Sequence, residues 1–491
     1  MTYTDATFQE IDKALELAAR AYIPFKNSSL GARRNFLHAI AQGLEAAASA
    51  LVELAVGETH LGAERLKGEL ARTCWQLRSY SDAALAGHHL DVRIDKANPD
   101  RKPAPKPDIR KMMVPLGPVV VFGSSNFPFA YSTAGGDTAC ALAAGCPVIV
   151  KAHPAHSETS EAVAKIILAA AASTHMPEGV FAHLHGAGFE TGKALVVHPL
   201  VKAVGFTGST SGGKALFDWA NQRKEPIPVF SEMGSINPVF LLPEKLRQSG
   251  EQVARDYAAS ITLSVGQFCT NPGLLIGIAG DALHLFATQL GALMEAVPPA
   301  FMLHQGIARA YEQKRQTALT QANVETVGVS KVPGTGEGVP TLARTSAAAF
   351  LSNPVLHEEV FGPYSLLVEC KDAQEMLQVA LHLEGQLTST LIASDEDWKA
   401  HSQLIEVVQQ HCGRLILNGV PTGVEVVTAM QHGGPYPATT DSRFTSVGAD
   451  GIRRFTRPVS YQNFPDHLLP EALQNGNPLG IWRLVDGNWE Q

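Results

Sequence analysis

Cys269 stands out in this chain because it lies in a loop-forming sequence rather than in an apolar run. The segment 266–273 reads Gly-Gln-Phe-Cys-Thr-Asn-Pro-Gly. A thiol attacks as its thiolate, so it needs a nearby base or a lowered pKa. Glu232 lies upstream in Phe-Ser-Glu-Met-Gly-Ser, and it is a candidate base. Together they predict an enzyme with a covalent intermediate on sulfur, although each alone could be an inert buried thiol or a surface carboxylate.

Two further segments could bind the groups that such a reaction needs, and a third resembles a binding motif only in part. Asn126, in Phe-Gly-Ser-Ser-Asn-Phe-Pro, could donate its side-chain amide to an oxyanion or could cap a helix. Gly208 and Ser209 lie where a strand is expected to lead into a helix, which is a phosphate site or a plain turn. Gly-Ala-Gly-Phe-Glu-Thr-Gly at 186–192 is one residue too long for the dinucleotide fingerprint and is interpreted as a tight turn.

An α/β framework must position these residues. Short apolar runs alternate with helical stretches from 117 to 241, which predicts a parallel sheet covered by helices on both faces. The expected strands are 119–122, 147–150, 180–183, 203–206 and 228–230. The expected helices run from the Asn126 loop to about 144 and over 157–173, 190–197 and 211–222. The alternation resumes from 236 to about 430, so we expect a second α/β unit.

The remaining segments surround these two units. Residues 8–86 carry apolar residues at helical spacing, which predicts helices. Residues 94–108 contain four prolines and many charges. That composition predicts a linker or an extended arm that pairs with another subunit. The tail from 459 to 491 carries aromatics and prolines and is expected to wrap the surface.

Composition narrows the class of protein. The chain has 491 residues, of which 45% are hydrophobic, so it can bury large cores. Its net charge of −8 argues against a general nucleic-acid or anionic-membrane binder. The six cysteines form no CxxC pair, which predicts neither a disulfide framework nor a metal site. With no secretory signal and no apolar run of ~20 residues, a cytoplasmic protein is expected.

Taken together and in this order, the segments resemble the aldehyde dehydrogenase family over nearly the whole chain. The resemblance is carried by Ser-Asn-Phe-Pro (125–128), Val-Lys (150–151), Gly-Phe-Thr-Gly-Ser-Thr (205–210), Ser-Glu-Met-Gly-Ser (231–235), Gly-Gln-Phe-Cys (266–269) and Glu-Glu-Val-Phe-Gly-Pro (358–363). It implies a Rossmann-like parallel-sheet cofactor domain (1–87 and 115–235) and an α/β catalytic domain (236–437). It also implies a small β oligomerisation arm with a C-terminal wrap (88–114 and 438–491), in a homodimer or homotetramer.

The resemblance also implies a role for each candidate residue. Cys269 attacks an aldehyde to form a thiohemiacetal, while Asn126 and the backbone N–H of Cys269 hold the oxyanion. Hydride passes to a nicotinamide, and Glu232 then activates the water that hydrolyses the thioester. Glu232 could also help to deprotonate Cys269. The implied cofactor contacts are Lys151 at the adenosine ribose, Gly208 and Ser209 at the pyrophosphate, Glu359 at the nicotinamide ribose and Phe361 near the nicotinamide ring.

Two departures from the family pattern stand out. Pro154 lies three residues after Lys151, where many NAD-preferring members carry a glutamate that binds the ribose 2′-hydroxyl. Without that carboxylate a 2′-phosphate meets no repulsion, so we expect NADP to be accepted and preferred, with NAD also usable. Many relatives have a lysine where this chain has Gly135, so any role of that lysine is absent or met otherwise.

The segments 433–441 and 477–486 resemble one branch of the family, the dehydrogenases of 2-oxoglutarate semialdehyde (2,5-dioxopentanoate) in bacterial sugar-acid breakdown. NADP-dependent fatty or broad-range aldehyde dehydrogenases lie near that branch and are the alternative. Arg72 favours the acidic substrate, because it belongs to a helix that lines the substrate mouth in the family and arginine can clamp a carboxylate. A solvated helix charge is the other interpretation. Tyr131 and Phe268 are expected to form the wall beside the reacting carbon, or simply an aromatic core.

A different class of enzyme is also consistent with these residues. The same cysteine, glutamate and asparagine could serve a cysteine esterase or hydrolase that has no redox step. Formation of reduced nicotinamide from an aldehyde distinguishes the two classes. Acylating chemistry with coenzyme A is disfavoured, because Glu232 is present to activate water.

Overall fold

A five-stranded parallel sheet holds the first half of the predicted alternation. The computed structural model describes residues 3–491, and this sheet has the strand order β5-β4-β3-β6-β7. Its strands are β3 (Val119–Phe122), β4 (Val148–Lys151), β5 (Phe181–Leu184), β6 (Ala203–Thr207) and β7 (Val229–Glu232). All four residues of β3 are buried, as expected for a parallel sheet covered on both faces. The predicted strands are confirmed, with ends that differ by one or two residues.

Helices cover both faces of this sheet. One face packs against α2 (Leu30–Ala46), α3 (Ala48–Thr59), α4 (Ala63–Leu85), α5 (Gly136–Ala144) and α6 (Ser157–Ser173). The other face packs against α1 (Phe8–Lys26), α7 (Phe189–Val197) and α8 (Thr210–Asn221). Alternate residues of β3 point to the two faces, Val119 and Val121 to the first and Val120 and Phe122 to the second.

The helix expected directly after the Asn126 loop begins later than predicted. Residues 127–135 form turns, and α5 starts only at Gly136. The carboxylate of Glu69, from α4, accepts hydrogen bonds from the backbone N–H groups of Phe129 and Ala130 at 2.8 and 3.0 Å. These donors are therefore held by a distant side chain rather than by a helix, an arrangement that no local pattern encodes.

A seven-stranded sheet forms the second α/β unit, in the order β11-β13-β14-β9-β8-β15-β16. Its strands are β8 (Val239–Leu241), β9 (Leu274–Ile278), β11 (Glu325–Val329), β13 (Thr341–Ser346), β14 (Tyr364–Cys370), β15 (Gln386–Ile392) and β16 (Cys412–Leu417). All pair in parallel except β11, which is antiparallel to β13. One face packs on α9 (Pro243–Thr262) and α10 (Asp281–Ala296). The other packs on α11 (Gln305–Leu319), α12 (Ala347–Ser352), α13 (Ala373–Leu381) and α15 (Ser402–Val408).

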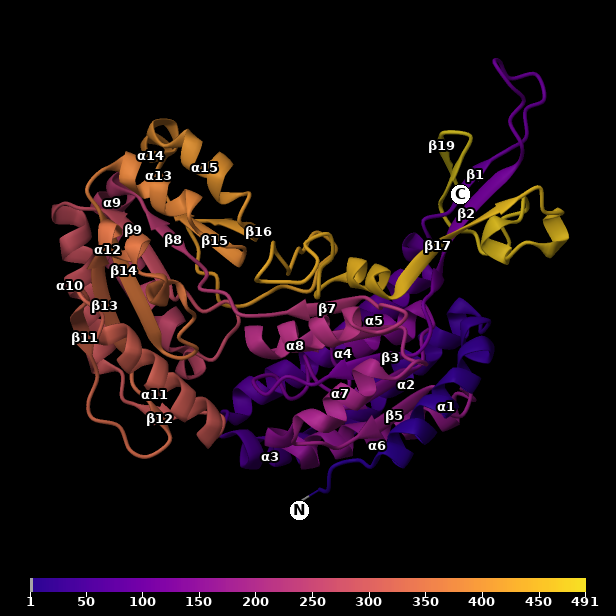
Figure 1. Ribbon diagram of the computed structural model, residues 1–491, viewed down its shortest axis with the longest axis horizontal. Coiled ribbons are helices and arrows are strands. Elements are labelled where there is room, and N and C mark those ends of the chain that lie inside the picture. The colour runs from indigo at the N-terminus through magenta and orange to yellow at the C-terminus, as the bar shows by residue number, and fades with distance from the viewer. Residues whose placement is uncertain (1–2) are drawn as a thin grey trace.

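A third sheet projects from the body as an arm (Figure 1). It is built in the order β17-β2-β1-β18-β19 from β1 (Arg93–Asp95), β2 (Ile109–Pro115), β17 (Thr456–Gln462), β18 (Arg483–Val485) and β19 (Asn488–Glu490). The proline-rich segment between β1 and β2 extends from its tip, as the arm interpretation predicts. Within residues 3–491 no single helix is long and apolar enough to cross a membrane; one pair, α2 and α3, passes that test only when joined across a 72° bend.

Candidate active site

The candidate site lies where the carboxyl ends of strands in the first sheet meet the amino ends of strands in the second. The predicted residues at these ends are Asn126, Lys151, Ser209 and Glu232 in the first sheet and Cys269, Glu359 and Phe361 in the second. The side-chain amide of Asn126 donates to the carbonyl of Gln267 at 3.2 Å and so joins the two sets. The strand order reverses beside β3, and open α/β sheets bind ligands at such a switch point.

The loop that carries Cys269 has an unusual backbone. Ser264, Val265 and Gly266 have consecutive positive φ angles of 47°, 58° and 66°. Positive φ is strained for a β-branched residue such as Val265, and strain of this kind tends to occur at functional sites. A Cβ on Gly266 would lie 2.3 Å from the carbonyl carbon of Gly362, so only glycine fits there. The loop is thus fixed against the backbone that precedes β14.

Two asparagines hold the same loop from the other side. Asn237, with φ of 48°, donates its amide to the carbonyls of Cys269 and Asn271, both at 2.9 Å. Asn126 donates its side-chain amide to the loop, and its backbone carbonyl accepts a 2.6 Å hydrogen bond from Arg65. The helix-cap interpretation of Asn126 is wrong, because the next helix, α5, begins after Gly135.

The thiol of Cys269 lies in a cluster with two buried titratable side chains. Its Sγ is 3.6 Å from Nε2 of His432, and the same nitrogen is 3.1 Å from Oε1 of Glu232. The other carboxylate oxygen of Glu232 accepts a 2.6 Å hydrogen bond from the hydroxyl of Ser446. Glu232 is only 3% exposed, which excludes the surface-carboxylate interpretation. Cys269 is partly exposed, unlike the buried thiols of Cys74, Cys140, Cys146 and Cys370.

The electrostatics of this cluster favour a protonated thiol on Cys269 next to an ionised carboxylate on Glu232. Burial raises the pKa of Glu232, but the charge of His432 and the hydrogen bonds from His432 and Ser446 outweigh burial, so this pKa lies below its usual value. Burial and the negative charge of Glu232 raise the pKa of Cys269 well above its usual value, and the charge of Arg72 opposes them. A carboxylate that is ionised near neutral pH can accept a proton from the thiol or from water.

His432 and Ser446 were not among the residues predicted from the sequence. His432 is separated from Cys269 by 163 positions, and its ring is fully buried. Its backbone N–H donates to the hydroxyl of Thr445 at 2.9 Å, and its carbonyl accepts from the backbone N–H of Ser446 at 2.8 Å. The only signal in the sequence is a histidine directly before the Gly-Gly-Pro segment that begins at 433.

Aromatic and cationic side chains line the other side of the thiol. The rings of Phe127 and Tyr131 are 5.2 Å apart and those of Phe127 and Phe268 are 5.6 Å apart, each pair edge to face. Arg72 donates to the Tyr131 hydroxyl at 3.5 Å, and its Nε is buried with no hydrogen-bond partner within residues 3–491. Arg65 stacks on Phe127 and Phe268, with its guanidinium carbon 5.0 and 4.9 Å from the two ring centres. These contacts bring the predicted Arg72, Tyr131 and Phe268 into one region.

The predicted cofactor residues lie together at the other end of the site. Ser209 caps α8 by accepting from the backbone N–H of Gly212 at 3.2 Å, and Gly208 and Ser209 are exposed at the start of that helix. Such a helix start can hold a pyrophosphate. A Cβ on Gly234 would lie 2.7 Å from a carboxylate oxygen of Glu359, so the backbone approaches that side chain closely. Burial raises the pKa of Glu359 to about 7, and the charge of Lys314 opposes this shift.

These observations fit a bound dinucleotide. Phe361, two residues after Glu359, lines the same small cavity as Glu359 and Phe268. Lys151 ends β4 and is half-buried, and burial lowers its pKa. Pro154 starts a short 3₁₀-helix, so no carboxylate is present at that position. The loop 186–192 leads into α7. Two of its N–H groups donate to the carboxylate of Asp5, so this side chain occupies the donors that a phosphate would need.

The glycine at position 135 has a steric explanation. A Cβ on Gly135 would lie 2.5 Å from the carbonyl oxygen of Ala130 and 2.7 Å from the backbone nitrogen of Ser132. These contacts are with backbone atoms, which cannot move aside cheaply. The turns over 127–135 therefore exclude any side chain at this position.

Comparison with known proteins agrees with this geometry. The family model described as "Aldehyde dehydrogenase family" matches residues 1–458. Alpha-ketoglutaric semialdehyde dehydrogenase 2 of Azospirillum brasilense is 50% identical over 482 residues, which cover 98% of this chain and 92% of that protein. Alpha-ketoglutaric semialdehyde dehydrogenase of Acinetobacter baylyi is 44% identical over 487 residues, which cover 99% of this chain and 92% of that protein.

Solved structures share the fold at lower identity. A 1-pyrroline-5-carboxylate dehydrogenase from Thermus with bound NAD has a TM-score of 0.79 at 23% identity, covering 94% of this chain and 86% of that one. Lactaldehyde dehydrogenase from Escherichia coli has a TM-score of 0.80 at 21% identity, covering 94% and 92%. The sequence matches and the structure matches agree, so the predicted aldehyde dehydrogenase fold is confirmed. The chain belongs to the aldehyde dehydrogenase family, which oxidises aldehydes to acids with NAD(P), and this favours oxidation over the hydrolase alternative.

Proposed function

We propose that this chain oxidises 2-oxoglutarate semialdehyde (2,5-dioxopentanoate) to 2-oxoglutarate. The observation that carries the proposal is the placement of a cation, Arg72, in the wall of the site, where it donates to the Tyr131 hydroxyl at 3.5 Å and its charge acts on the Cys269 thiol. Arg72 has an unpartnered buried Nε and contacts Tyr131, so it can bind the carboxylate of a substrate whose aldehyde reaches Cys269. The names of the Azospirillum and Acinetobacter relatives specify the same substrate.

The residues of the site divide the reaction among them. Cys269 attacks the aldehyde carbon, and the side-chain amide of Asn126 with the backbone N–H of Cys269 holds the oxyanion. The bound nicotinamide supplies the hydride acceptor. Glu232 takes a proton from the water that hydrolyses the thioester, because its carboxylate is ionised and buried next to the thiol. Tyr131 and Phe268 form the wall beside the reacting carbon.

The proposed cofactor is NADP in preference to NAD. Gly208 and Ser209 hold the pyrophosphate at the start of α8, Glu359 binds the nicotinamide ribose and Phe361 packs near the ring. Lys151 lies at the adenosine ribose and provides a positive charge there. Pro154 supplies no carboxylate to repel a 2′-phosphate, and this absence supports the preference.

A pre-steady-state measurement with Glu232→Gln tests the chemistry. The variant should release about one equivalent of reduced nicotinamide per active site in a burst, because oxidation precedes the step in which Glu232 activates water. Turnover after the burst should then be slower by a factor of about 10² or more, because general-base help to water is lost. If the variant shows no burst of reduced nicotinamide and an unchanged turnover rate, Glu232 does not have the proposed role.

Steady-state kinetics test the substrate and the cofactor separately. We expect 2,5-dioxopentanoate to have a higher kcat/KM than hexanal, and NADP a higher kcat/KM than NAD. A preference for hexanal would favour the broad-range alternative. A preference for NAD would refute the cofactor proposal and leave the substrate proposal intact.

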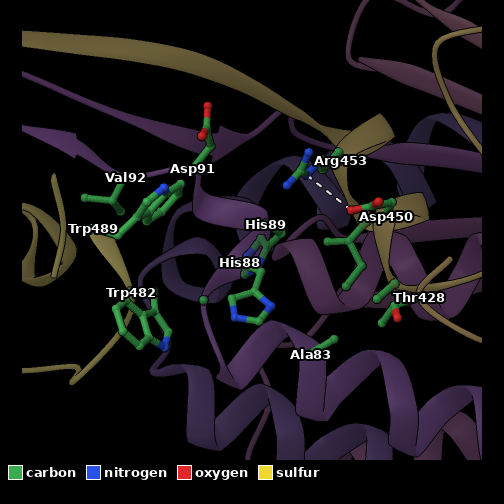
Figure 2. A pocket seen from close by; sticks show the side chains of 13 residues that line it. Ala83, His88, His89, Asp91, Val92, Thr428, Asp450, Arg453, Trp482 and Trp489 are labelled. Atoms are coloured by element: carbon green, nitrogen blue, oxygen red, sulfur yellow. Dashed lines mark ion pairs between the residues drawn. The ribbon is translucent and has the colours of Figure 1, made fainter. Parts of the chain in front are cut away.

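We also propose a division of the chain into a cofactor domain (1–87 and 115–235), a catalytic domain (236–437) and the arm (88–114 and 438–491). The arm is proposed to hold copies of the chain together. β16 is an edge strand of the seven-stranded sheet, and its Leu415 and Leu417 are exposed. An unpaired apolar edge favours pairing with another chain, so we propose that the arm of one copy packs along β16 of the next. Trp482 and Trp489 are also exposed and rim a cavity of about 520 Å³ between arm and body (Figure 2). Light scattering should give a dimer or tetramer, and Leu417→Lys should shift it toward monomer.

The proposed location is the cytoplasm. All six cysteines, which lie within the described residues, are free thiols. Free thiols persist in a reducing compartment. Fractionation of the native cells would test the location directly.

A further inference from the structure

A cluster of two histidines and a glutamate lies at the edge of the first sheet, outside the active site. His183 is on β5 and His185 directly follows that strand, and their ring centres are 4.8 Å apart. Glu161 is on α6, which packs against β5. Within residues 3–491, two groups of metal-ligating side chains bring three donor atoms within 4.8 Å of one another: this cluster and the thiol cluster of the active site.

One carboxylate oxygen of Glu161 faces both rings. Oε2 is 3.2 Å from Nε2 of His185 and 3.3 Å from Nδ1 of His183. The first contact is a hydrogen bond, in which the imidazole N–H donates to the carboxylate. The second is not, because Nδ1 of His183 is buried and makes no hydrogen bond within residues 3–491. A histidine–carboxylate pair therefore explains His185 but leaves the second histidine unexplained.

The other nitrogen of His183 indicates where this ring carries its proton. Nε2 is 2.8 Å from the hydroxyl of Ser160, and the side chain is only 4% exposed. A proton on Nδ1 would be a buried donor without an aligned acceptor, which costs stability, so the proton belongs on Nε2. Nε2 then donates to Ser160, and the lone pair of Nδ1 faces the carboxylate oxygen of Glu161. Two electron-rich atoms at 3.3 Å repel each other, and a cation bound to both would remove that repulsion.

We propose that Glu161, His183 and His185 form a binding site for one zinc ion, with water as the fourth ligand. A tetrahedral zinc ion with bonds of about 2.0–2.2 Å places neighbouring ligand atoms about 3.3–3.5 Å apart. The two separations from Oε2, 3.2 and 3.3 Å, are close to that spacing. Ser160 holds the tautomer of His183 from behind, as the outer-shell partners of metal-binding histidines do.

The donor set favours zinc over magnesium or calcium. Imidazole nitrogen suits zinc and its neighbours, whereas magnesium and calcium prefer oxygen ligands. The side chain of Glu161 is 27% exposed, so an ion can enter from solvent. Its Oε1 is 3.5 Å from the ammonium of Lys165, which is 73% exposed, so water screens that charge. When the ion binds, the proton on Nε2 of His185 moves to Nδ1 of the same ring, which keeps this ligand neutral.

A zinc ion at this position would join three segments of the chain. The ring of His185 stacks on Tyr3, with ring centres 4.0 Å apart, and its carbonyl accepts a 2.9 Å hydrogen bond from the N–H of Ala6. The ion would therefore hold α6 and β5 together beside the segment that precedes α1. None of the three ligands has a role in the reaction proposed above, so the two proposals can fail separately.

Isothermal titration with zinc chloride tests the site, in a Cys269→Ala background that removes the competing thiol. We expect one zinc ion per chain and a melting temperature that rises with zinc concentration, and neither effect with magnesium chloride. Glu161→Gln and His185→Gln should each lower the zinc affinity by more than about 10²-fold, because each removes a ligand. Ser160→Ala should lower it about tenfold, since the loss of an outer-shell partner typically costs about 10–100-fold.

The matched control is His198→Gln. His198 is also 3.3 Å from a carboxylate, that of Asp12, and is 15% exposed like His185. Within the described part of the chain no third donor completes that pair, so this variant should keep the zinc affinity. Equal affinity in Glu161→Gln, His185→Gln and their parent would overturn the proposal. Equal losses in His198→Gln would also overturn it, because they would indicate nonspecific binding to surface histidines.

Titration with cobalt chloride, in the same Cys269→Ala background, gives a second readout that needs no ligand variant. Co²⁺ in a four-coordinate site absorbs visible light strongly, whereas six-coordinate Co²⁺ absorbs weakly. We expect one equivalent of strongly absorbing Co²⁺ that zinc displaces. Weak bands alone would overturn the site even if a ligand variant failed to fold, and a melting temperature without metal shows which variants are folded.

Discussion

The thiol region and the cofactor region of this site are built in different ways. The thiol region consists of Asn126, Glu232, Cys269 and His432, and the cofactor region of Lys151, Ser209, Glu359 and Phe361. Three of the thiol-region side chains are buried, and they come from segments separated by as many as 306 positions. The cofactor-region side chains are exposed or partly exposed. In that region Ser209 caps the start of α8 and Lys151 ends β4.

This difference sets how each region responds to change. In the thiol region each step depends on one atom, such as the Cys269 sulfur, and no neighbour can replace it. In the proposed cofactor region several N–H groups and side chains would share one ligand, so the loss of one would leave the others in place. Substitutions in the thiol region should therefore cost orders of magnitude in rate, and those in the cofactor region a few-fold in KM.

The largest effect is expected for Cys269→Ala. It removes the atom that bonds to the aldehyde, so kcat should fall by more than about 10⁴-fold, as with other covalent nucleophiles. The measurement is the absorbance of reduced nicotinamide during turnover. Cys412→Ala, at another partly exposed free thiol, is the control and should change kcat less than about twofold. Residual activity near one tenth in Cys269→Ala would contradict the proposed division between the regions.

Gly266→Ala should have the next largest effect, through the backbone alone. Its Cβ would meet the carbonyl carbon of Gly362 at 2.3 Å, and its φ is positive. The loop must move, and a displacement of about 1 Å at a nucleophile can cost about 10²-fold in rate. We expect a lower kcat with unchanged cofactor KM and a lower melting temperature. Gly57→Ala, which meets nothing within 4 Å, is the control and should leave kcat unchanged.

The same difference explains what the sequence could predict. The helix over 157–173 and the strands around it follow from local apolar periodicity, and the structure has α6 over the same residues. Ser209 could be predicted because a strand-to-helix turn is a local motif. The start of α5 was missed because Glu69, far along the chain, binds the N–H groups of Phe129 and Ala130.

His432 shows the same limit within the site. Its contacts with Cys269 and Glu232 arise only when the segment before residue 446 packs along β7, where Met233 N–H donates to the carbonyl of Ala438 at 2.8 Å. No spacing rule connects residues that far apart. Arg65, which donates to the backbone carbonyl of Asn126, is likewise far from it along the chain.

Arg72→Ala tests where the thiol region ends and substrate recognition begins. Losing a charged partner of the substrate carboxylate should raise KM for 2,5-dioxopentanoate about 10–150-fold, since hydrogen bonds to charged groups contribute about 1.5–3 kcal/mol. KM for hexanal, which has no carboxylate, should change little. Lys67→Ala on the same helix is the control, because Lys67 is exposed and paired with Glu64 at 2.7 Å. Equal effects on both aldehydes would refute the recognition role.

Glu359 predicts a pH dependence confined to the cofactor region. Burial raises its pKa to about 7, so it carries a proton below that pH and is a carboxylate above it. Only the carboxylate accepts hydrogen bonds from both ribose hydroxyls, so KM for the cofactor should fall about five-fold as pH rises through about 7. The folded state binds this proton more tightly than the unfolded state, so in the absence of cofactor stability falls as pH rises from about 4.5 to about 7 and is constant above that.

Two neighbouring variants isolate this titration. In Glu359→Gln the cofactor KM should no longer depend on pH near neutrality. Glu358→Gln removes the adjacent exposed carboxylate, which lies 3.5 Å from Lys314, and should keep the dependence. An unchanged pH profile in Glu359→Gln would assign the titration to another group.

The smallest effect is expected at the far end of the cofactor region, from Asp5→Asn. The Asp5 carboxylate accepts hydrogen bonds from the N–H groups of Ala187 and Gly188 at 2.7 and 3.2 Å, and these bonds lower its pKa. Its charge also acts on Lys151, so the N-terminal segment places a negative charge near the proposed 2′-phosphate position. Asparagine keeps one acceptor without the charge, so kcat/KM for NADP should rise about threefold while that for NAD changes less, as expected for a screened surface charge. An equal change for both cofactors would mean that Asp5 only anchors the N-terminal segment, and that Pro154 and Lys151 set the preference without it.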